Sequence, residues 1–173
     1  MLGARVIPGL PADRARIRTT LSYQFTPRIS AGIEYNPLAE DLQPLANWRL
    51  WDETEERPGA ILGISSARIG SSRGSSYNLS FVKSLEPWTD LPVAPYAGLS
   101  FDDVEQEWSI IGGLSVAWSE QWHSLHLWDG KNFHTVVDRT IGDHSVGLVI
   151  AQQDEDWYAG LSWSWSFPGP GGP

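Results

Sequence analysis

Strict alternation of large apolar and small polar residues is the feature of this sequence that most constrains its fold. It is clearest in residues 157–167, where Trp, Ala, Leu and Phe occupy the odd positions and Tyr, Gly and Ser the even ones. Side chains of a β-strand point alternately to its two faces, whereas a helix of 3.6 residues per turn would mix the two sets. The segment therefore predicts a strand with one broad apolar face and one small, hydroxyl-rich face.

The same division recurs along the chain, and clusters of Gly, Pro, Ser, Asn and Asp separate the alternating runs. About eleven strands can be counted in this way. A closed bacterial barrel has an even number of strands, so the count contains one strand too many or lacks one within residues 4–17. We predict an all-β fold, an antiparallel up-and-down β-barrel of roughly 8–12 strands that spans a membrane.

Three regions follow from this pattern. Residues 1–16 are rich in arginine and are expected to form an N-terminal extension, either frayed or folded into the barrel as a plug. Residues 17–167 are expected to form the barrel, and residues 168–173 a flexible Pro/Gly tail. The first residues lack the basic and apolar regions of a secretory signal, so we expect that an exported precursor has lost its signal by cleavage.

The character of the polar face favours a membrane barrel over a soluble one. It consists mainly of Ser, Gly, Ala, Thr and Asn, whereas a strand facing water normally carries Lys and Glu. Among the ten tryptophans, Trp108 and Trp118 bracket one alternating strand. Ten residues at about 3.3 Å each, tilted by about 40°, span a band near 25 Å tall, the height of the apolar band of outer-membrane barrels.

The end of the chain resembles the C-terminal signature of bacterial outer-membrane β-barrel proteins. Leu161, Trp163, Trp165 and Phe167 alternate toward a terminal aromatic residue, and residues 168–173 follow where such barrels usually stop. The resemblance implies a location in the bacterial outer membrane, with membrane lipids as partners. The candidates for aromatic girdles at the two membrane surfaces are Trp108, Trp118, Trp157, Trp163, Trp165 and Phe167.

Charged residues on the polar faces are candidates for the lumen. In a narrow barrel they would pair and fill it, and in a wider one they would line a pore. His126 and His134 flank the predicted turn at 129–132, and both are expected to face the lumen. The lumen or pore-lining candidates are Arg28, Glu34, Arg49, His126, His134 and Asp138.

Composition narrows the possible functions. The chain has no cysteine, which excludes a disulfide framework, a thiolate metal site and a cysteine nucleophile. Its net charge of −9 argues against nucleic acid as a partner. We predict no catalytic residues, no metal site and no cofactor, and the oligomeric state stays open.

The expected role is therefore structural or that of a passive pore. One alternative is a soluble β-barrel that binds an apolar ligand, with the large apolar face turned inward. A second is a membrane-embedded lipid hydrolase, in which His126, His134 and Asp138 would work with a serine of the lumen.

Overall fold

The computed structural model describes residues 1–71 and 73–167. The predicted tail, 168–173, lies outside the described residues. Within the described ranges no helix is both long and apolar enough to cross a membrane. The helices and strands of these ranges are, in chain order, β1 (Leu2–Val6), α1 (Asp13–Arg16), β2 (Ile17–Thr26), β3 (Ile29–Asn36), β4 (Asp41–Trp51), β5 (Gly59–Ser66), β6 (Ser75–Val82), α2 (Glu86–Thr89), β7 (Val93–Asp102), β8 (Glu107–Ala117), β9 (Trp122–Trp128), β10 (Phe133–Ile141), β11 (His144–Gln153) and β12 (Asp156–Trp165).

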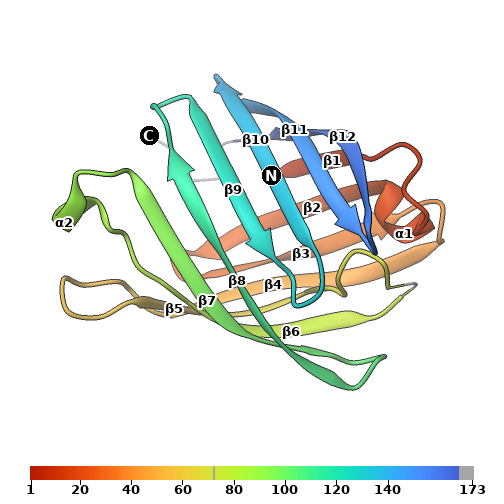
Figure 1. The fold of residues 1–173 in the computed structure, drawn as a ribbon, viewed down its shortest axis with the longest axis horizontal. Helices are drawn as coiled ribbons and strands as arrows, with labels where there is room; N and C mark the ends of the chain where they lie inside the picture. Colours follow the sequence, from red (N-terminus) through yellow and green to blue (C-terminus); the bar gives the residue numbers. More distant parts are fainter. Residues whose placement is uncertain (72, 168–173) are drawn as a thin grey trace.

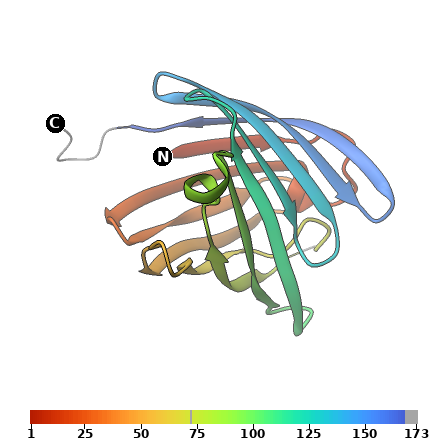
Figure 2. The ribbon, with the colours of Figure 1, turned by 60° about the vertical axis from the view of Figure 1, so that its left-hand side comes forward.

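The twelve strands close into one antiparallel barrel in which each strand pairs with its neighbours in the sequence (Figures 1 and 2). β1 completes the ring by pairing with both β2 and β12, so that Leu2 lies opposite Leu21 on one side and Trp165 on the other. The prediction of an all-β antiparallel barrel is confirmed, with a strand number at the top of the predicted range.

The barrel begins earlier in the chain than the sequence predicts. Residues 2–6 form β1 instead of belonging to an extension, and they supply the strand that an odd count lacks. β1 has only five residues, and its inner face consists of Gly3 and Arg5. Such a short strand with an arginine inside gives little periodic signal, which is why the predicted boundary at residue 17 is wrong.

The large apolar side chains project from the outer surface of the barrel. The following are each at least 60% exposed: Phe25, Leu42, Trp108, Ile110, Trp118 and Leu161. The predicted orientation of Leu, Trp and Phe outward is confirmed. A soluble barrel with its large apolar face turned inward would have the opposite arrangement.

Small polar residues form a row across the inner wall from β4 to β8. The residues in register there are Asn47, Gly63, Asn78, Ser100 and Ser109. The middle of this row is crowded, because an added Cβ on Gly63 would lie 2.7 Å from Asn78 Oδ1 and 3.0 Å from Asn47 Oδ1 and would displace these amide groups. Such small side chains leave space in the lumen.

The connection between β1 and β2, residues 7–16, folds into one end of the barrel, which we call the plug end. Ile7 and Leu10 are fully buried and cluster with Val149 and Ala151 of the inner wall of β11. Residues 7–16 therefore form a plug, the second of the two arrangements expected for the arginine-rich segment 1–16, and are not a frayed end. The opposite end, where β1 begins and β12 ends, is called the terminal end.

Arg14 in α1 fastens the plug to the wall. Its side chain is 3% exposed and its Nη1 atom lies 3.9 Å from Glu34 Oε1. It also donates hydrogen bonds to backbone carbonyls of the β5–β6 connection, those of Ala67, Arg68 and Ser71. A buried guanidinium is tolerated when its donors find acceptors in this way.

Candidate functional site: the lumen

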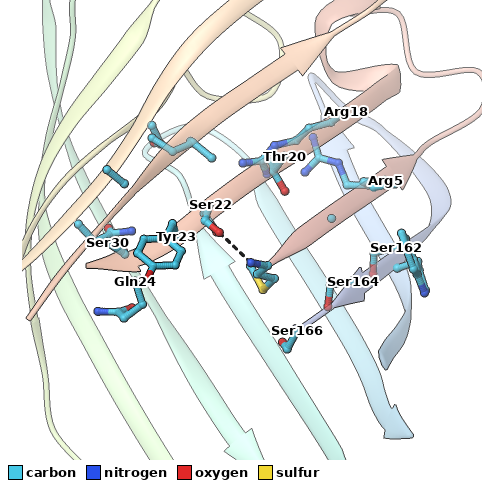
Figure 3. A pocket seen from close by; sticks show the side chains of 18 of the residues that line it. Arg5, Arg18, Thr20, Ser22, Tyr23, Gln24, Ser30, Ser162, Ser164 and Ser166 are labelled. Carbon is cyan, nitrogen blue, oxygen red and sulfur yellow. Dashed lines mark hydrogen bonds between the residues drawn. The ribbon is translucent and has the colours of Figure 1, made fainter. Parts of the chain in front are cut away.

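The lumen holds a cavity of about 720 Å³ beside β1, β2 and β12 (Figure 3). Hydroxyl groups line it from the two strands that flank β1. Thr20 and Ser22 come from β2, Ser162 and Ser164 from β12, and Ser166 follows the end of β12. These are the small polar faces that the alternation predicts, and together they make a wall rich in hydrogen-bond donors and acceptors.

Two arginines lie at the deep end of this cavity, toward the plug. Arg5 of β1 stands opposite Arg18 of β2 and opposite Ser162 of β12 in the register, and Figure 3 shows the two guanidinium groups close together. Arg18 Nε donates a hydrogen bond of 2.6 Å to Glu34 Oε2. Among the described residues, no carboxylate lies within 4 Å of Arg5.

Glu34 is the buried anion of this region. Its side chain is 1% exposed, and it lies beside Arg18 and Arg14 from two different elements. Asn36 Nδ2 donates a third contact, 3.0 Å long, to Glu34 Oε1. Glu34 thus faces the interior, as predicted, and its single charge is shared by two arginines.

A smaller cavity of about 160 Å³ lies on the other side of the lumen, against β5 to β9. Its lining includes Ser66, Asn78, Ser100 and Asp102. Ser65 lines both cavities. The smaller cavity extends toward the plug end, where Asp102 and Asp129 line it.

His134 and Asp138 also lie on the inner face, as predicted, but both are engaged by protein groups. His134 is 5% exposed, and its Nε2 atom lies 2.7 Å from Asp129 Oδ2. Asp138 accepts a 3.0 Å hydrogen bond from the hydroxyl of Ser145. Within the described part of the chain, no group of three His, Asp or Glu side chains is placed to hold a metal ion.

His126 does not face the lumen, and the prediction that it does is wrong. The β9–β10 turn places Trp128 opposite Phe133, which pairs His126 with Thr135 on the outer face and Leu127 with His134 on the inner face. The two histidines therefore lie on opposite sides of the wall. The length of the turn decides this, because shifting a register by one residue exchanges the two faces.

Arg28 and Arg49 lie at the rim of the terminal end instead of inside the lumen. Both are more than half exposed and both pair with Asp52 of the β4–β5 connection, at 3.0 Å and 3.2 Å. The hydrogen bonds from Arg49 and Arg28 hold the pKa of the Asp52 carboxyl below its usual range. The alternation of the strands predicts a lumen position for both arginines, and this prediction is wrong because both lie where the strands emerge from the barrel.

Aromatic side chains collect at both ends of the barrel. Trp108 and Trp157 lie at the plug end, and Trp118 and Trp165 at the terminal end, all on the outside and well exposed. Trp163 is half-buried and stacks on His144 with ring centroids 5.8 Å apart. Phe167 packs edge-on against Trp165 at 5.4 Å. Trp157 and Trp165 therefore bracket β12 in the way that Trp108 and Trp118 bracket β8.

Sequence reasoning missed Arg5 and Arg18 as lumen residues. Arg18 begins the polar face that continues through Thr20 and Ser22, so the alternation of β2 could have indicated it. Arg5 gave no comparable signal, because only the pairing of β1 with β2 and β12 places it inside.

No protein-family model matches the chain, and no curated protein matches it in sequence. The functional information therefore comes from the two faces of the barrel wall and from the cavities inside the lumen.

Proposed function

We propose that this chain is a bacterial outer-membrane β-barrel that acts as a passive pore for small polar solutes, with membrane lipids as its surroundings. The observation that carries the proposal is the orientation of the wall. Large apolar side chains face outward, while hydroxyl and amide groups line an internal cavity of about 720 Å³ together with Leu45, Val136 and Val149. Outer-membrane barrels alternate in this sense, with apolar residues toward lipid and polar residues toward the lumen.

The outer surface supports the membrane location energetically. Burying one such side chain is worth about 1.5–3 kcal/mol, and soluble monomers rarely expose contiguous apolar patches of more than a few hundred Å². Rings such as Trp108 and Trp118 stand at the two edges of this surface. Trp is enriched at membrane–water interfaces, where its indole meets both lipid and water.

The interior of the barrel is the second line of support for a narrow pore. The plug reaches from β11 to the β5–β6 connection, and the smaller cavity lies against β5 to β9 and shares the lining residue Ser65 with the larger one. Solutes passing this way would meet serine, asparagine and arginine side chains. Polar linings of this kind let water and small polar solutes through a barrel.

The first test is the behaviour of the purified full chain. We expect it to be monodisperse in non-ionic detergent, to aggregate in plain buffer and to give discrete current steps in a planar lipid bilayer. A chain that is monodisperse without detergent would contradict the membrane location. A chain that inserts correctly into the bilayer but gives no current would contradict the pore and leave a structural role for the barrel.

A second candidate function, a lipid hydrolase, is favoured by one group of contacts on the outer wall. Ser124 Oγ lies 3.1 Å from His126 Nε2, and His126 Nδ1 lies 3.1 Å from Thr135 Oγ1. In the tautomer that donates to Thr135, Nε2 can take the Ser124 proton while Oγ adds to an ester carbonyl, and return it to the departing alkoxide. A water that the same Nε2 deprotonates would then cleave the acyl-serine and release the fatty acid. Trp118 Nε1 donates to Ser124 Oγ at 2.9 Å, and Ser124 is 2% exposed, so this indole must move aside for reaction.

If the outer wall is catalytic, the barrel in mixed micelles will hydrolyse phospholipid esters, and both Ser124→Ala and His126→Ala will reduce turnover to background. His123→Ala is the matched control, because His123 lies on the inner face of the same strand opposite Asp138. Turnover that survives Ser124→Ala, or a wild-type chain without turnover, would remove this candidate and leave Ser124 as the anchor of the Trp118 ring.

A further inference from the structure

The charges of the larger cavity are all of one sign. Among the side chains that line it, Arg5 and Arg18 are the charged ones, and no Asp or Glu is among them. The chain as a whole carries a net charge of −9. A positive cavity inside an acidic protein is therefore a local arrangement and not a reflection of composition.

The two arginines are not fully neutralised by the protein. Glu34 supplies one negative charge, which Arg18 and Arg14 already share at 2.6 Å and 3.9 Å. The Nε atom of Arg5 is buried and has no hydrogen-bond partner among the described residues. Like charges directly opposite each other on neighbouring strands repel, and a buried charged donor without an acceptor is costly.

The surroundings of Arg5 suit a small oxyanion. Thr20 and Ser164 lie on either side of Gly3 in the register, two residues along β1 from Arg5 and on the same face. The absence of a side chain at Gly3 makes room for the Thr20 hydroxyl, since an added Cβ there would lie 2.6 Å from Thr20 Oγ1. A guanidinium offers paired donors that match carboxylate and phosphate oxygens, and hydroxyls add further donors.

We propose that Arg5 and Arg18, with the hydroxyls of Thr20, Ser162 and Ser164, form an anion-binding site in the lumen that takes small carboxylates or phosphates. The site rests on the cavity and its charges alone. Its consequence for transport, a preference for anions over cations, rests on the proposed function as a pore.

The test is binding of inorganic phosphate and of acetate to the full chain in a non-ionic detergent, which keeps lipid phosphates out of the experiment. We expect saturable binding that Arg5→Gln weakens by about tenfold or more, the usual size of a hydrogen bond to a charged group. Arg28→Gln is the matched control, because it removes the same charge from an exposed rim pair, and it should leave binding unchanged.

The proposed site would be contradicted if Arg5→Gln and Arg28→Gln weakened anion binding equally, or if neither phosphate nor acetate bound saturably. If Arg5→Gln does not fold, Arg5→Lys carries the test, with binding reduced several-fold because the paired donors are lost. Reversal potentials across a salt gradient then separate the two proposals. A conducting but cation-selective barrel contradicts this inference alone, whereas anion binding without current contradicts only the pore.

Discussion

Glu34→Gln is expected to lower the free energy of unfolding by about 3–5 kcal/mol, the cost of removing one partner from a buried ion pair. Glu34 is 1% exposed and its carboxylate lies against both Arg18 and Arg14. Glutamine keeps the size of the side chain but not its charge. Arg14 and Arg18 would then lie close together, and near Arg5, without the carboxylate that both of them contact.

The matched control is Asp52→Asn at the rim, where one carboxylate also bridges two arginines, Arg28 and Arg49. All three side chains are exposed there, so water and salt screen the pair and stability should barely change. Urea unfolding of the barrel in lipid vesicles or detergent measures both variants. Equal stability of Glu34→Gln and the wild-type chain would show that the arginines do not depend on this carboxylate.

Leu161→Arg is expected to destabilise the barrel in a bilayer by about 2–4 kcal/mol, the cost of arginine at the lipid-facing midplane of a membrane barrel. Leu161 is 68% exposed and lies on β12 midway between Trp157 and Trp165, so it should sit near the centre of the apolar band. The cost arises because the guanidinium has to leave water for hydrocarbon.

Leu42→Arg is the control for depth. Leu42 is also outward and 60% exposed, but it is the second residue of β4 at the plug end, where arginine should cost about 0–1 kcal/mol. Reversible unfolding in vesicles gives both values. If the two substitutions are equally harmless, the outer face meets water, and the proposal of a membrane-spanning wall is contradicted.

The fold could be predicted largely from the sequence because its signal is local. An alternation such as that of residues 157–167 repeats every two residues, so a single strand reveals its two faces without any knowledge of its neighbours. β1 escaped this reasoning, because five residues containing Gly3 and Arg5 carry almost no contrast between faces. Its place in the barrel depends on pairing with β12 at the far end of the chain.

The candidate site was predicted only in part. Glu34 is predictable because it lies in the alternating run of β3, and Asp138 shares a face with His134 because the two are four residues apart on β10. His126 was misplaced because the length of one turn sets the register of β9 against β10. Arg28 and Arg49 were misplaced because alternation tells which face a residue takes and not how deep in the barrel it lies.

The sequence by itself determined a wall with two unlike faces, since a period of two residues sorts side chains whatever lies beside the strand. Only the tertiary structure decided what the enclosed space contains. Ring closure brings Arg5 beside Arg18, and the folded plug carries Arg14 to Glu34. The physical reason is that charge pairing and cavity volume depend on distances between residues far apart in the chain, which only closure of the barrel brings together.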